Sequence, residues 1–203
     1  MRAANASTSI APWLALAVGV VNLLGTLFLF LMFMLMFTGH SNGDPFGPLN
    51  DFSNGLGAAL SAALAASLHG WLRARKPRIA LPALILAIVG ALIGIYGSWL
   101  IMSDRTGFVL AGLVSMAGYG LIGLWLLALN RGSSWPQGLV KLGIAVGAVM
   151  ALGLAAIPSI VMRIDSFEAS AWHTWIGQSA WLGWGVLLPI WALRLWKTLR
   201  SGP

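Results

Sequence analysis

Long apolar runs alternate along this chain with short polar segments, and the alternation predicts six membrane-spanning helices. A helix needs about 20 mostly apolar residues to cross a hydrocarbon core of roughly 30 Å. Six stretches reach this length, at residues 12–38, 52–72, 79–102, 107–129, 137–162 and 171–196. They are continuously apolar instead of alternating every second residue, which favours helices over the strands of a barrel. The predicted fold is an all-α integral membrane protein with one transmembrane domain over 1–203.

The polar segments between the runs are short, so consecutive helices should be antiparallel neighbours that form three hairpins in one bundle. Asn50 or Asp51 is expected to cap the second helix, because a side-chain oxygen there accepts from the first free N–H groups. Pro158 and Pro189 fall inside the fifth and sixth runs. Each lacks an N–H donor and crowds the preceding turn, so we expect a kink or loosened hydrogen bonding at both positions.

Composition and charge strengthen the membrane assignment. The chain is 59% hydrophobic and 8% charged, whereas a soluble domain carries about a quarter charged residues. Alternate polar segments, with both chain ends, hold ten of the 12 basic residues and no acid, while the other segments hold all five acids with Arg105 and Arg163. This positive-inside pattern predicts both termini on the cytoplasmic side and loops 39–51, 103–106 and 163–170 on the outer side.

The net charge of +7 predicts contact with anionic lipid headgroups at the cytoplasmic face. Nucleic acid is not expected as a partner, because the basic residues are already explained by membrane orientation. Glycines four residues apart, at Gly90 and Gly94 and again at Gly143 and Gly147, predict closely packed helices. The alternative is that small residues leave room for a lipid or another apolar ligand. A glycine face left uncovered would also permit a homo-oligomer or a membrane partner.

Several chemistries are absent from the sequence. There is no cysteine, and no charged residue is expected near a helix midpoint, where proton relays and ion paths place theirs. The favoured expectation is therefore a non-enzymatic scaffold, subunit or accessory factor, with no catalytic residue and no cofactor. A membrane-embedded enzyme is a further alternative. A water-accessible cavity reaching Asn22, Tyr96 or Gln178 would instead favour a transporter.

The main alternative is a binding site on the outer face for a small amphipathic or cationic molecule, a lipid or a divalent ion. Its candidate residues form a polar rim above an aromatic floor, and they are His40, Asp44, Asp51, Glu168 and His173 for the rim, with Trp181 and Trp184 for the floor. A polar rim over an apolar floor suits an amphipathic ligand, and the acids favour a cation. No bound metal is predicted, because there is no H-x-x-H or H-E-x-x-H pair.

Three sequence features carry a resemblance. They are the segment DPFGPLND at 44–51 leading into NGLG at 54–57, the segment LIGLWLLALN at 121–130, and the order of the hairpins. In these features the chain resembles uncharacterised small multi-pass membrane proteins of bacteria. The resemblance implies a bacterial cytoplasmic membrane location. These bacterial proteins have no established activity, so the resemblance identifies no functional residue.

Overall fold

The computed structural model describes residues 10–39 and 43–201, and within these ranges every regular element is helical. The first four spans are α1 (Ala11–Phe37), α2 (Phe46–Arg75), α3 (Pro77–Met102) and α4 (Phe108–Asn130). The fifth consists of α5 (Gln137–Ala151), a 3₁₀ segment (Leu152–Ala156) and α6 (Ile157–Val161). The sixth consists of α7 (Trp172–Trp181), a π-helical segment (Leu182–Leu187) and α8 (Leu188–Ser201). Six described helical spans are thus long and apolar enough to cross a membrane, which confirms the six predicted runs.

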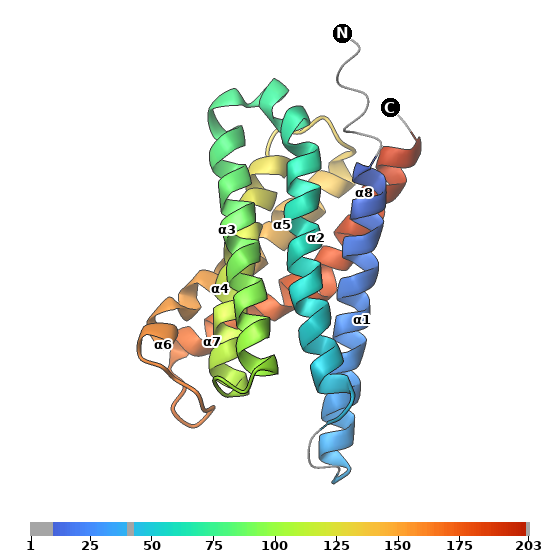
Figure 1. The fold of residues 1–203 in the computed structure, drawn as a ribbon. Coiled ribbons are helices and arrows are strands. Elements are labelled where there is room, and N and C mark those ends of the chain that lie inside the picture. Colours follow the sequence, from blue (N-terminus) through green and yellow to red (C-terminus); the bar gives the residue numbers. More distant parts are fainter. Residues whose placement is uncertain (1–9, 40–42, 202–203) are drawn as a thin grey trace.

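The helix α4 lies at the centre of the bundle. In its most apolar stretch 72% of the residues are buried, against 17% in α1. It contacts α2, α3, α5, α6 and α7, while α1 contacts α2, α8 and the π-helical segment. Both ends of the described chain lie at the same end of the bundle, at the top of Figure 1. We call this the basic end, and the opposite end, which carries the loops 103–107 and 162–171, the acidic end.

Glycines on α4 bring three helix backbones into direct contact. A Cβ at Gly118 would lie 2.5 Å from the Gly90 carbonyl oxygen and 2.6 Å from the Gly94 nitrogen, both on α3. On the other side of α4, a Cβ at Gly123 would lie 2.7 Å from the carbonyl oxygen of Gly147 on α5. Only hydrogen fits at these crossings, so the prediction that the glycines serve close helix packing is confirmed.

Prolines interrupt the last two spans, as predicted. The 3₁₀ segment ends just before Pro158 and the π-helical segment just before Pro189. Because Pro189 has no N–H, it cannot donate to the carbonyl oxygen of Gly185 one turn earlier. The Thr26 hydroxyl of α1 donates to that oxygen instead, over 2.7 Å. The last span changes direction at this interruption. The helix α8 packs along α1, whereas α7 is directed away from α1 and toward α6 (Figure 1).

The start of α2 corrects one prediction. The helix begins at Phe46, after Pro45, so Asn50 and Asp51 lie in its second turn and neither caps it. Gly43 turns the chain into this helix with φ +62°, and its carbonyl oxygen accepts from the Phe46 nitrogen at 3.0 Å. A turn closed by Gly43 and a proline replaces the side-chain cap. The amides of Asn50 and Asn54 are thereby free for contacts inside the bundle.

We predict that Gly118→Ala destabilises the protein by about 1–3 kcal/mol, because the obstructing atoms belong to the α3 backbone and cannot rotate away. Gly70 on α2 is the matched control, since nothing lies within 4 Å of its added Cβ. Gly70→Ala should be neutral or stabilising by up to about 1 kcal/mol through helix propensity. Unfolding by SDS titration in mixed micelles measures both, and equal stability of the two variants would contradict the packing role.

Candidate functional site

Two adjoining hollows lie at the acidic end. The deeper one, which we call the chamber, has a volume of about 440 Å³ and is walled by α1, α2, α3, α4 and α7, with Phe167 from the loop after α6. The shallower one, which we call the vestibule, has a volume of about 970 Å³. Residues that line both are Phe33, Asp51, Ile101, Phe108 and Phe167. The boundary between the chamber and the vestibule is therefore a collar of apolar side chains that contains one carboxylate.

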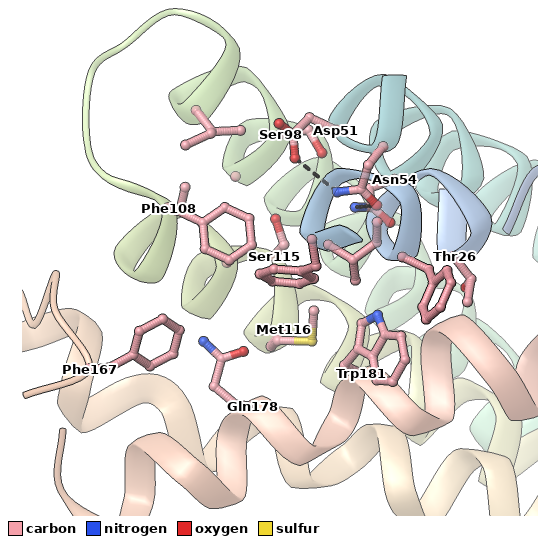
Figure 2. A pocket seen from close by; sticks show the side chains of 18 of the residues that line it. Thr26, Asp51, Asn54, Ser98, Phe108, Ser115, Met116, Phe167, Gln178 and Trp181 are labelled. Carbon is pink, nitrogen blue, oxygen red and sulfur yellow. Dashed lines mark hydrogen bonds between the residues drawn. The ribbon is translucent and has the colours of Figure 1, made fainter. Parts of the chain in front are cut away.

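A chain of hydrogen bonds forms the polar wall of the chamber. The buried Trp184 Nε1 donates to Asn54 Oδ1 over 3.1 Å. Asn54 Nδ2 donates to Asn50 Oδ1, and Asn50 Nδ2 donates to Asp51 Oδ1, each over 3.2 Å. The chain ends on the half-buried Asp51, which keeps its second carboxylate oxygen for another partner. Figure 2 shows Asp51, Asn54 and Ser98 together on this side.

The opposite wall comes from α7. Gln178 points its amide into the chamber and lies across from Ser115, with Trp181 beside it (Figure 2). On α4, an added Cβ at Gly112 would meet only Gln178 Nε2, at 3.8 Å. The missing side chain at Gly112 therefore keeps this part of the chamber open. Most of the remaining lining is apolar, so the chamber combines apolar walls with a few fixed polar groups, as ligand pockets do.

The vestibule gathers all the acidic residues of the chain. Its lining includes Asp44, Asp51, Asp104, Asp165 and Glu168. Among the described residues none of these acids has an ion-pair partner, although Arg105 and Arg163 belong to the same loops, and Arg105 lies over the ring of Trp99. The excess of carboxylates around one hollow creates a negative potential that concentrates cations there. Among residues 10–39 and 43–201, Asp51 alone of the charged residues lines the chamber as well.

One vestibule acid, Asp165, has a structural role at the start of α4. Asp165 accepts hydrogen bonds from the backbone nitrogens of Gly107 at 2.7 Å and Leu110 at 3.0 Å, and from the Thr106 hydroxyl at 2.9 Å. It therefore caps α4 from a distant loop, at the positive end of the helix dipole. Partial burial opposes its ionisation, but these three hydrogen bonds outweigh burial and hold the pKa of Asp165 below its usual range.

The structure brings together only part of the predicted site. Asp44, Asp51 and Glu168 line the vestibule, and Trp181 lines the chamber. Trp184 lies behind the polar wall, stacked on Tyr119 with ring centroids 3.7 Å apart.

His173 lies outside both hollows, with its Nδ1 2.6 Å from the Ser159 hydroxyl, and His40 is outside the described residues. Among residues 10–39 and 43–201, no three His, Asp or Glu side chains are close enough to hold a metal ion.

The sequence predicts Asn22, Tyr96 and Gln178 as the polar residues that a transporter cavity would reach. Of these three, only Gln178 lines the chamber. Asn22 is buried and donates to the Val18 carbonyl oxygen, and Tyr96 stacks on Trp99 at the surface. Asn50, Asn54 and Gly112 were not predicted as lining residues. The spacing of Asn50 and Asn54, one helical turn apart and next to Asp51, was the available signal for a polar face.

No protein-family model matches the chain, and comparisons with curated proteins and with solved structures found no match. The resemblance to small bacterial membrane proteins therefore stays a prediction, and the function is argued from the two hollows.

We predict that Asp165→Ala destabilises the protein by about 1 kcal/mol at pH 7, as loss of a helix cap usually does. A lowered pKa means that the ionised carboxylate stabilises the fold above its unfolded pKa of about 3.9. This stabilisation is lost as the pH falls through the lower folded pKa. The difference between wild type and variant should therefore shrink below about pH 4. Glu168→Ala, which removes an exposed acid, is the control, and an equal loss in both variants would contradict the capping role.

Proposed function

We propose that this protein binds a small amphipathic cation at the acidic end of the bundle. The apolar part of the ligand occupies the chamber, and its cationic group lies at Asp51. One observation carries the proposal: a vestibule lined by every acid of the chain and a largely apolar chamber adjoin, and Asp51 lines both. A scaffold needs no cavity, whereas the chamber reaches Gln178, one of the residues that were expected to mark a transporter. The chamber therefore favours ligand binding, which a transporter also requires, over a purely structural role.

Charge and burial act together at this junction. The vestibule attracts cations and repels anions, and the half-buried Asp51 gives a cation a partner in a partly water-excluded place, where ion pairs are stronger than at the surface. Burial of the apolar part then adds about 25 cal/mol for each Å² removed from water. Gln178, which faces the polar wall, supplies a donor and an acceptor that fix the orientation of the ligand.

We place the protein in the bacterial cytoplasmic membrane, with the basic end and both termini on the cytoplasmic side and the vestibule facing outward. Segregation of the charged residues between the two ends supports this orientation. Exposed tryptophans support the placement across a membrane, because Trp172 at the acidic end is 71% exposed and Trp13 at the basic end is 58% exposed. Such side chains anchor a protein at the two membrane interfaces.

We expect octyltrimethylammonium to stabilise the protein in phosphatidylcholine nanodiscs, and octyl sulfate not to. The two probes share a tail and differ in charge, so their comparison isolates the carboxylates. A specific ligand stabilises by about 2.7 kcal/mol at a hundredfold excess over Kd. The thermal unfolding midpoint measures this effect. Equal shifts with both probes would indicate nonspecific insertion and contradict the proposal.

Two substitutions test the two halves of the site. Asp51→Asn should weaken binding of octyltrimethylammonium about tenfold, or 1.4 kcal/mol, by removing the charge at the junction. Gly112→Leu should abolish binding by filling the chamber, where only Gln178 Nε2 lies near the added Cβ. Gly70→Leu, at a glycine with nothing within 4 Å, is the control for the added side chain. Unchanged affinity in Gly112→Leu would show that the ligand binds elsewhere.

A further inference from the structure

The chamber has a second open side, between α1 and α7. Two side chains line the chamber but not the vestibule and are nevertheless more than half exposed: Phe30 of α1 at 61% and Trp175 of α7 at 56%. Phe167, from the loop before α7, lines both hollows and stacks on Trp175 with ring centroids 5.9 Å apart. This side of the chamber therefore has an aromatic, apolar border, in contrast to the acidic border of the vestibule.

The opening follows from the interruption at Pro189. The helix α8 and the π-helical segment pack against α1, whereas α7 packs on α4, α5, α6 and the 3₁₀ segment. The chain therefore leaves α1 at the π-helical segment, and the space between α1 and α7 widens toward the acidic end (Figure 1). The Thr26 hydroxyl, bonded to Gly185, marks the closed end of this gap.

The depth of the opening places it near a membrane interface. Phe30 lies seven residues before the end of α1, and Asp51 lies five residues after the start of α2. At 1.5 Å per residue, Phe30 is about 10 Å and Asp51 about 8 Å from the outer end of its helix. The 27 residues of α1 form a helix of about 40 Å, longer than the roughly 30 Å hydrocarbon core. Asp51 is thus at the level where headgroups meet hydrocarbon, and the opening faces the outermost part of the acyl chains.

We infer that the ligand is drawn sideways from the membrane: a lipid-like amine or quaternary ammonium with a single hydrocarbon chain. This inference rests on the proposed function and names its ligand class and source. The chain passes between Phe30 and Trp175 into the chamber while the cationic head stays at interface depth beside Asp51. A volume of about 440 Å³ is near the lower end for ligand pockets, which suits one chain and not two.

The absence of cysteine from the chain allows a direct test. Two single-cysteine variants, Phe30→Cys at the side opening and Asp104→Cys in the vestibule, are reacted with the same bulky maleimide and placed in phosphatidylcholine vesicles. The probe is dodecyltrimethylammonium with a diazirine at the tail end, and flash photolysis at increasing times gives its rate of binding. The unreacted variants control for the substitutions themselves.

The label at residue 30 should slow binding at least tenfold, and the label at residue 104 should change it less than twofold. The reverse result would show that the ligand comes from water through the vestibule, and it would overturn the lateral route while leaving the proposed function intact. Saturable crosslinking to α2, α4 or α7 peptides in the wild-type protein supports the site. If wild-type crosslinking is not saturable, or is unchanged in Gly112→Leu, the proposed function fails together with this inference.

Discussion

Direct backbone contact at glycines holds α4 in the centre of the bundle, and the other helices take their positions from it. Inside a membrane, lipid tails compete equally for apolar side chains, so helices associate through close van der Waals packing. Gly118 meets α3 and Gly123 meets α5 at distances that leave no room for a Cβ. These crossings bring Ser98 and Ser115, which line the chamber, next to the buried Tyr119 behind them. The chamber therefore depends on glycine contacts between residues that do not line it.

Prolines have the opposite effect in the last two spans, because they prevent a straight helix from closing the bundle. A regular last helix would continue in the direction of α8, which packs along α1. The π-helical segment before Pro189 instead turns α7 toward α6. The freed Gly185 carbonyl is satisfied by Thr26, which avoids the cost of an unpaired polar group in hydrocarbon. A local backbone defect, stabilised by a neighbouring hydroxyl, thus produces the hollow.

The five acids carry the same charge and line the same hollow, but their surroundings give them different roles. Asp165 accepts hydrogen bonds from two backbone nitrogens and one hydroxyl, and these bonds attach its loop to the loop before α4 and to the first turn of α4. Asp44, Asp104 and Glu168 are exposed and contribute mainly long-range potential. Asp51 alone is half-buried, is oriented by Asn50 and lies against apolar walls. Orientation by neighbours and partial loss of water are the conditions under which one carboxylate recognises a cation specifically.

The sequence by itself determined the number of spans, the membrane character and the gathering of acids at one end, because hydropathy and charge depend on residue type and order alone. It also located the two helix interruptions, since proline lacks an N–H in any fold. Only the tertiary structure decided which polar residues face a cavity. Helix rotation and tilt set this, and they depend on packing between distant segments. For this reason Gln178 and Gly112 line the chamber while His173 bonds Ser159 and Trp184 lies behind the wall. The start of α2 was likewise decided by a turn at Gly43 that fits against Met32 of α1, a contact that no local sequence pattern contains.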